Sequence, residues 1–241
     1  MRVEAVAVVL PAHDEESLLP VALEAVRIAS GHPRVERVRV LIVVVADACG
    51  DRTARVARAA GAAVVTCDAR NPGLARAAGA AHALRALDTA AEHIWIATTD
   101  ADSEVPPHWL AHQLARAREG WEAVVGTVTL PAGSSVTNVH RVRYEATRPS
   151  HGIWHHPHVH GANLGVTAAA YLSVGGFPAL TVGEDRALVA ALRRGGHRVL
   201  ATAACPVLTS PRLRGRAHGG FADHLTTLTR RSTQEHQKAA D

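Results

Sequence analysis

The segment His93–Asp102, with the sequence HIWIATTDAD, contains the strongest structural signal in the chain. Its first half, His93–Ala97, is a short apolar run of the kind that forms a buried parallel strand. Asp100 and Asp102 follow at the end of that run, and their spacing places both carboxylates on one side of an extended turn. Such a pair suits a hard divalent cation such as Mg²⁺ or Mn²⁺. Taken alone, the pair is equally consistent with an ordinary turn.

The rest of the first half alternates between short β-branched runs and helical patterns. Repeated strand–helix–strand units predict an α/β fold with a mostly parallel, Rossmann-like central sheet and helices on both faces. The predicted strands are Val3–Leu10, Val38–Val45, Ala62–Thr66 and His93–Ala97. The predicted helices are Ser17–Ala29, Asp51–Ala60 and Pro72–Leu87. Ser17 is the expected N-cap of the first helix, and Asp51 or Thr53 helps to start the second.

Acidic residues follow the predicted strands. Ligands of open α/β sheets bind outside the carboxyl ends of the strands. Four such ends are expected to meet at one edge, carrying His13-Asp14-Glu15, Asp47, Asp68 and Asp100-Ala101-Asp102. Carboxylates crowded at one edge repel one another unless a cation or hydrogen-bond donors compensate. This position favours a metal site over a plain turn.

The second half of the chain has a less regular pattern. The expected helices are His108–Glu119, Val139–Thr147 and Glu184–Arg194, the last ending at Gly195-Gly196. The expected strands are Glu122–Leu130, Ala162–Val166 and His197–Ala203, with a turn at Gly175-Gly176. No linker is long enough to separate two domains, so one continuous domain of two abutting halves is expected.

Composition excludes several classes of function. Lys238 is the only lysine, which argues against a Walker-type phosphate loop and a Schiff-base mechanism. The net charge of +4 is carried by arginine, but only 3% of residues are aromatic, so a diphosphate partner fits better than nucleic acid. Three dispersed cysteines predict no disulfide framework and a reducing, cytoplasmic compartment. No stretch has the roughly 20 apolar residues of a membrane span.

Five segments, in order, resemble motifs of the family 2 glycosyltransferases, which have the GT-A fold. Each motif is weak alone, but together they cover residues 5 to about 195. The matching segments are Pro11–Glu16, Val44–Thr53, Asn71–Gly79, Asp100–Asp102, and Gly175–Pro178 with Glu184-Asp185. Ala46-Asp47-Ala48 departs from the common pattern at the loop that contacts the base. Leu74 stands where a basic residue is common, which leaves Arg70 and Arg76 as phosphate candidates. Arg76 is equally consistent with a solvated helix face.

The resemblance implies a metal-dependent, inverting hexosyltransferase in which Asp185 acts as the general base on an acceptor hydroxyl. Asp102 would bind Mn²⁺ or Mg²⁺, and Asp47 would accept a hydrogen bond from the base of the nucleotide-diphosphate sugar, with a UDP-sugar as the expected donor. Glu184 and Asp185 are also consistent with acidic residues in the first turn of a helix, where they stabilise the helix dipole. The other residues expected at the donor are Pro11, His13, Glu15, Arg76, Asp100 and Ala101.

Three features of the second half extend the resemblance. Trp154, Gly161, Asn163 and Glu184 are expected in the acceptor pocket, although Trp154 is equally consistent with a core residue. The histidines of His151–His160 fit a flexible acceptor loop, with zinc binding as the alternative. The third feature is a basic loop whose arginines would close over the diphosphate: Arg212, Arg214 and Arg216. His218, in the same loop, would add a metal ligand.

These predictions divide the chain into a nucleotide-sugar-binding half, residues 1–102, and an acceptor-binding half, residues 103–241. The acceptor is a small molecule, a glycan or a lipid-linked molecule, with peripheral membrane contact through the basic loop. Two alternatives remain: a nucleotidyltransferase on a similar fold, and a non-catalytic nucleotide-sugar-binding module. The first is disfavoured because His13-Asp14-Glu15 stands where a glycine-rich, lysine-containing signature is expected.

Overall fold

One eight-stranded sheet contains strands from both halves of the chain. A computed structural model describes residues 2–132, 142, 156–212 and 226. The strand order is β3-β2-β1-β4-β7-β6-β8-β5. The strands are β1 (Ala5–Ala12), β2 (Arg39–Asp47), β3 (Ala63–Cys67), β4 (Ile94–Thr98), β5 (Ser103–Glu104), β6 (Ala123–Thr129), β7 (Leu164–Thr167) and β8 (Val199–Thr209).

The four strands of the first half are parallel, as the sequence predicts. β1 pairs with β2 on one side and with β4 on the other, and β2 pairs with β3. β1 is buried on both faces, which explains its continuous apolar sequence AVAVVLPA. Each predicted strand is found, with its boundaries displaced by one or two residues.

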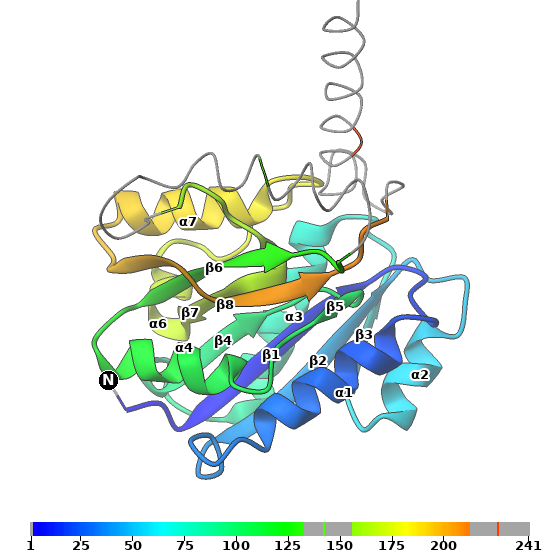
Figure 1. Cartoon of the computed structure of the whole chain (residues 1–241), viewed down its shortest axis with the longest axis horizontal. Helices are drawn as coiled ribbons and strands as arrows, with labels where there is room; N and C mark the ends of the chain where they lie inside the picture. The colour runs from blue at the N-terminus through cyan, green and yellow to red at the C-terminus, as the bar shows by residue number, and fades with distance from the viewer. Residues whose placement is uncertain (1, 133–141, 143–155, 213–225, 227–241) are drawn as a thin grey trace, which may run out of the picture.

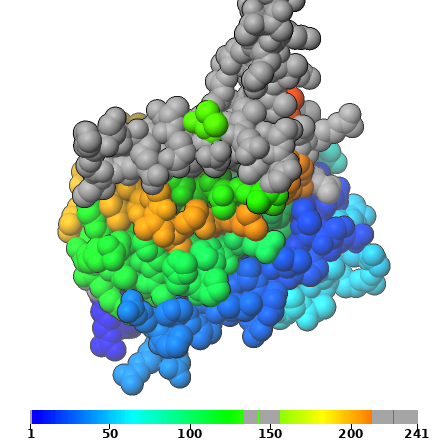
Figure 2. All heavy atoms as spheres, in the orientation of Figure 1, coloured from blue at the N-terminus to red at the C-terminus, as the bar shows by residue number. Residues whose placement is uncertain are grey.

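Helices cover both faces of the sheet (Figure 1). The side chains of β1 alternate, so that Val6, Val8 and Leu10 belong to one core cluster and Ala5, Ala7 and Val9 to the other. The first cluster includes residues of α1 (Leu19–Ser30), α2 (Thr53–Ala59) and α4 (Trp109–Arg118). The second includes residues of α3 (Pro72–Leu87), α6 (Ala168–Ser173) and α7 (Glu184–Arg194). In the space-filling view, α4 and α1 lie side by side below β8 (Figure 2).

The second half makes the sheet mixed. β7 is antiparallel to both β4 and β6, whereas β6 and β8 are parallel. β8 continues to Thr209, six residues beyond the predicted end, because its carboxyl end pairs with the short edge strand β5. β5 and α6 are not predicted from the sequence, because both are too short to show a period.

The predicted helix boundaries were compared with the capping residues that the structure shows. The predictions for α3 and α7 were correct, and the side chain of Asn71 caps α3 by accepting a hydrogen bond from the Leu74 N–H. The prediction of Ser17 as a cap was wrong, because α1 starts at Leu19 and Leu18 occupies the N-cap position. Asp51 does hold the start of α2, since its carboxylate accepts the N–H of Thr53 at 2.8 Å.

Two predicted elements fall wholly or partly outside the described residues: most of Val139–Thr147 and the first five residues of His151–His160. Among the residues that are described, no helix has the length and apolar character needed to cross a membrane.

Candidate functional site

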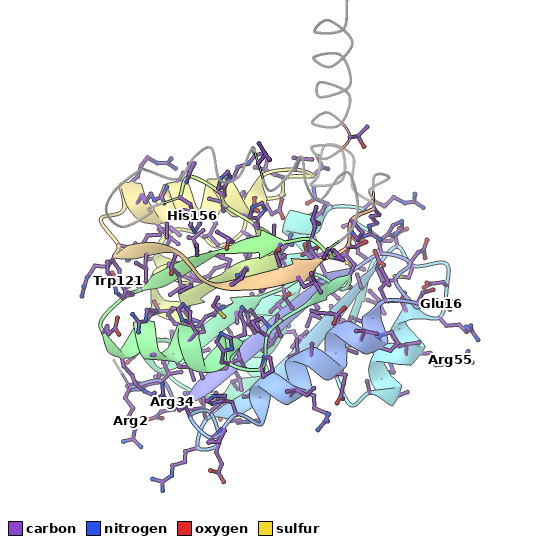
Figure 3. All side chains as sticks on the ribbon, in the orientation of Figure 1. Arg2, Glu16, Arg34, Arg55, Trp121 and His156 are labelled. Carbon is purple, nitrogen blue, oxygen red and sulfur yellow. The ribbon has the colours of Figure 1, made fainter. Side chains whose placement is uncertain are left out.

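A cavity of about 790 Å³ opens at the carboxyl ends of the parallel strands, a size that suits a small-molecule ligand. The end of β1 contributes Pro11, the loop after it contributes His13 and Glu15, and the turn after β4 contributes all of Asp100–Asp102. Glu16, the residue after Glu15, is labelled at this end of the sheet in Figure 3, and Trp121 is labelled at the opposite end. The strand ends therefore meet as predicted, except that Asp68 lines a second, smaller cavity.

Arg212 joins two of the acidic strand ends. Its guanidinium lies 2.6 Å from Glu15 Oε1 and 2.7 Å from Asp102 Oδ2. Burial and the neighbouring carboxylate of Asp100 nevertheless raise the pKa of Asp102 to about 6, against the opposing effect of Arg212. Among the described residues, one arginine thus pairs with two carboxylates at this point of the cavity.

Arg76 joins the donor-side and acceptor-side motifs. The guanidinium pairs with Asp100 at 2.5 Å and with Glu184 at the start of α7. Burial opposes the charge of Arg76, but the carboxylates of Asp100, Glu184 and Asp185 outweigh it and raise its pKa. With 5% of the residue exposed, the interpretation as a solvated helix face was wrong. Burial likewise raises the pKa of Glu184, although Arg76 acts in the opposite direction.

The guanidinium of Arg76 retains a donor for a ligand. Its buried Nε–H has no hydrogen-bond partner among the described residues, and Arg76 lines the cavity. A buried donor without a partner costs about 1–3 kcal/mol, and a bound anion would remove that cost. This observation supports the phosphate interpretation of Arg76.

Asp185 is held at the cavity wall by backbone donors. Oδ2 accepts the N–H of Gly161 at 2.8 Å, and Oδ1 accepts the N–H of Arg186 at 2.7 Å. Each carboxylate oxygen still has a lone pair, because an oxygen of this type can accept more than one hydrogen bond. Gly161 is fixed in turn by Thr98, whose hydroxyl donates to the Gly161 carbonyl at 2.6 Å. Asp185 therefore has a fixed orientation and spare capacity to accept a proton.

Asp47 has a structural role that was not predicted from the sequence. Its carboxylate accepts the backbone N–H groups of Ala69, Arg70 and Asn71 at 2.7, 2.9 and 2.9 Å. These bonds shape the loop that leads into α3. Asp47 still lines the cavity, so a contact with a nucleotide base would have to use its remaining acceptor capacity.

Asn163, predicted on the acceptor side, is buried and does not line the cavity. Its amide nitrogen donates to the carbonyls of Thr127 and Cys205, both at 2.8 Å, and its oxygen accepts from the indole of Trp109 at 2.9 Å. The side chain is buried and joins β6, β8 and α4. Gly161, three residues from β7, does line the cavity, as does Glu184.

Several predicted residues lie outside the part of the chain that the structure describes: Trp154, Arg214, Arg216 and His218. Within the described part of the histidine loop, the rings of His156, His158 and His160 form a stack with centroids 6.0 and 6.3 Å apart. His158 and His160 line the cavity, whereas His156 is buried. The sequence analysis also missed Arg186, another cavity-lining cation, for which a single charged residue on a helix gives no signal.

The donor set at the cavity fits a hard divalent cation. Six carboxylates and four arginines line the cavity among the described residues, so negative side chains exceed positive ones by two. The ligands that Asp102, Asp100 and Glu15 offer are carboxylate oxygens, which Mg²⁺ and Mn²⁺ prefer. A cation bound here would favour the ionised form of Asp102, whose pKa burial and Asp100 raise.

A model of the family described as "Glycosyl transferase family 2" matches residues 7–171, more than half of the chain. The chain belongs to glycosyl transferase family 2. Family membership agrees with the resemblance found in the sequence motifs and supports a glycosyltransferase. A comparison with curated proteins gave no match.

Several solved structures share the fold of this family member. S. aureus TarS 1–349 superposes with a TM-score of 0.63 at 15% identity, covering 87% of this chain and 60% of that one. Glucosyl-3-phosphoglycerate synthase from Mycobacterium tuberculosis, solved with Mn²⁺, UDP-glucose and phosphoglyceric acid, gives 0.56 at 23% identity, with coverages of 94% and 76%. Mannosyltransferase PcManGT from Pyrobaculum calidifontis, solved with GDP-Man and Mn²⁺, gives 0.58 at 20% identity, with coverages of 86% and 57%. These likenesses establish a GT-A-like α/β fold.

Proposed function

We propose that this family 2 member transfers a hexosyl group from a nucleotide-diphosphate sugar to an acceptor hydroxyl, with inversion at the anomeric carbon. One observation carries the proposal: Asp100, Asp102 and Asp185 line a single cavity, with Arg76 bridging the two motifs. A carboxylate with spare acceptor capacity therefore shares a cavity with the acidic turn. Residues 1–102 would supply the donor contacts and residues 103–241 the acceptor contacts.

Asp185 is the proposed general base. The acceptor hydroxyl gives its proton to this carboxylate while its oxygen forms a bond to the anomeric carbon. The bond from that carbon to the diphosphate breaks, and its electron pair leaves with the nucleoside diphosphate. Backbone hydrogen bonds from Gly161 and Arg186 hold the carboxylate in position during this step.

The leaving diphosphate requires positive charge. Asp102, with Asp100 and Glu15 beside it, would hold Mn²⁺ or Mg²⁺, and the bound cation would neutralise charge that develops on the diphosphate. Arg76 would donate its unsatisfied Nε–H to the same group. Arg212 and the arginines that follow it, Arg214 and Arg216, are the proposed diphosphate lid, and His218 is the proposed additional metal ligand.

Donor and acceptor identities are proposed at the level of chemical class. Solved neighbours that bind UDP, UDP-glucose or GDP-Man support a nucleotide-sugar donor, and a UDP-sugar is our first choice. The acceptor is a hydroxyl of a small molecule, a glycan or a lipid-linked molecule, with Gly161, Glu184 and Trp154 on the acceptor side. An acceptor of the last kind would require peripheral contact with a membrane.

The test combines donor selection with product stereochemistry. Thermal-shift assays with UDP-, GDP-, ADP- and dTDP-sugars, each with Mn²⁺, should show selective stabilisation by one donor, because binding to the native state raises the melting temperature. Proton NMR of the product formed from that donor should then show inverted anomeric configuration. Retention would refute the base role of Asp185, and transfer of a nucleotidyl group would favour the alternative enzyme class. Stabilisation without turnover of any acceptor would favour the binding module.

A further inference from the structure

A second group of potential metal ligands lies beside the cavity, between the loop after β1 and the loop after β2. One ligand atom from each of His13, Asp14 and Cys49 lies within 4.8 Å of the other two. All three residues are half-buried. The proposed sugar transfer uses neither Asp14 nor Cys49. Glu16, two residues beyond Asp14 in the first of these loops, is labelled in Figure 3.

His13 is oriented as a metal ligand. Its Nδ1 lies 2.7 Å from the carbonyl oxygen of Asp47, which can only accept, so Nδ1 carries the hydrogen. Nε2 of the neutral ring therefore has its lone pair available, an arrangement common in metal-binding histidines. Nε2 is 3.8 Å from Asp14 Oδ2, which is too long for a hydrogen bond. Two ligands of a tetrahedral zinc ion are separated by a similar distance, about 3.4 Å.

The carboxylate of Asp14 is fixed through one of its two oxygens. Oδ1 accepts the backbone N–H groups of Gly50 and Asp51 at 2.7 and 3.2 Å. The other oxygen, Oδ2, is the one that lies near His13. One oxygen therefore holds the second loop in place while the other remains near the imidazole.

Cys49 completes the group with a sulfur ligand. Its thiol donates to the Ala12 carbonyl at 3.4 Å and accepts the N–H of Asp14 at the same distance. Burial raises the pKa of this thiol, so it carries its proton when no metal is bound. Metal binding would transfer that proton to solvent and break the bond to Ala12. The bond from the Asp14 N–H would persist and would stabilise the thiolate.

We propose that His13, Asp14 and Cys49 form a binding site for a borderline-soft divalent cation of the Zn²⁺ class. Imidazole nitrogen and thiolate sulfur favour Zn²⁺ over Mg²⁺ and Mn²⁺, whereas Asp102, Asp100 and Glu15 offer carboxylate oxygens. Three protein ligands leave the fourth tetrahedral position for water. The bound cation would tie the loop after β1 to the loop after β2. Because His13 lines the large cavity, this cation would stiffen one wall of it.

Cobalt provides a probe that reports directly on the sulfur ligand. The full chain, reduced and freed of metal, is titrated with Co²⁺ while the absorption spectrum is recorded. We expect a sulfur-to-cobalt charge-transfer band and intense visible bands of tetrahedral Co²⁺ at one equivalent, and Zn²⁺ should abolish both. Other histidines in the chain cannot produce the charge-transfer band, because it requires a thiolate.

Matched cysteine variants localise the ligand. Cys49→Ser should remove the charge-transfer band and weaken Zn²⁺ binding by at least about 100-fold. Cys67→Ser is the control, because Cys67 lines the same small cavity as Cys49 but is outside the proposed ligand set. Asp102→Ala should leave the band unchanged, which separates this site from the proposed catalytic cation. Absence of the band in the unaltered protein, its survival in Cys49→Ser, or its loss in Cys67→Ser would each overturn the proposal.

Alkylation of the unaltered protein gives a second measurement that does not depend on a variant folding. Iodoacetamide modification of each cysteine is followed by peptide mass spectrometry with and without stoichiometric Zn²⁺. We expect Zn²⁺ to slow modification of Cys49 by about tenfold or more, since a metal-bound thiolate is a poorer nucleophile. Equal rates at Cys49 with and without Zn²⁺ would contradict the site.

Discussion

At the scale of single residues, the electrostatics of the site depend on which carboxylates pair with which arginines. Among the described residues, Arg76 pairs with both Asp100 and Glu184, and Arg212 pairs with both Glu15 and Asp102. The sequence analysis names all four acids but not their partners. The paired residues are 24 to nearly 200 positions apart in the chain, and spacing along the chain does not encode which of them meet.

Asp102 should make stability depend on pH. Its pKa of about 6 in the folded protein lies above its ordinary value of 3.8, so the folded state favours the protonated form. The stabilising contribution is full below pH 3.8 and is lost as the pH rises through 6. We expect the free energy of unfolding, relative to that of Asp102→Asn, to fall by on the order of 2–3 kcal/mol across this window.

Urea unfolding at several pH values, with EDTA present, measures this difference. Asn has nearly the shape of Asp but does not titrate, so subtracting the curve of the variant removes the contributions of other groups. Parallel curves for the two proteins from pH 4 to 7 would show that the Asp102 carboxylate has an ordinary pKa.

Asp185→Asn should abolish most of the proposed transfer without affecting the fold. Asn cannot take the proton of the acceptor hydroxyl, so we expect kcat to fall by about 10²–10⁴-fold, while the thermal shift produced by the donor stays the same. Asp88→Asn is the matched control, because Asp88 is an exposed C-cap residue of α3 in the left-handed conformation, which Asn tolerates. An undiminished kcat in Asp185→Asn would exclude Asp185 as the base.

At the scale of secondary-structure elements, buried polar and small residues join the layers. Gly79 of α3 lies so close to the sheet that a Cβ built on it would meet Val9 Cγ1 at 2.5 Å and Val45 Cγ2 at 2.8 Å. Asn163 has the same kind of role at the other end of the sheet, where it links β6, β8 and α4. The family resemblance placed Asn163 in a pocket, but its environment in the fold makes it a structural residue.

Asn163→Ala should therefore reduce stability rather than acceptor binding. The substitution leaves the indole N–H of Trp109 and the carbonyls of Thr127 and Cys205 without their partner, at a cost on the order of 3 kcal/mol. Chemical denaturation measures the loss, and the acceptor KM is compared at a temperature where the variant is folded. A raised KM with unchanged stability would restore Asn163 to the acceptor pocket.

At the scale of the whole molecule, the sheet brings together loops from both halves of the chain. β8 carries Arg212 back to the acidic ends of β1 and β4, and α7 begins beside the same cavity (Figure 1). The proposed donor and acceptor motifs therefore come together only when the chain is folded. Ligand binding should consequently be coupled to global stability.

Metal removal tests this coupling. With UDP and Mn²⁺ at a hundredfold excess over Kd, the native state should gain about 2.7 kcal/mol. For a protein of this size, that gain raises the melting temperature by roughly 5–10 °C. We expect EDTA, or the substitution Asp102→Asn, to remove most of the nucleotide-induced shift, because the proposed cation would join the diphosphate to the protein. A full shift in EDTA would show that arginines alone bind the diphosphate.

The sequence by itself determined the layered α/β fold, because runs of buried β-branched residues and helical periods are local signals. It also determined which acids end the strands, and the order of motifs identified the family. Only the tertiary structure decided that Arg212 joins Glu15 to Asp102 and that Arg76 joins Asp100 to Glu184. It also decided that the side chains of Asn163 and Asp47 form hydrogen bonds with backbone groups. These contacts depend on long-range packing and on the competition of burial with charge, and neither can be read from neighbouring residues.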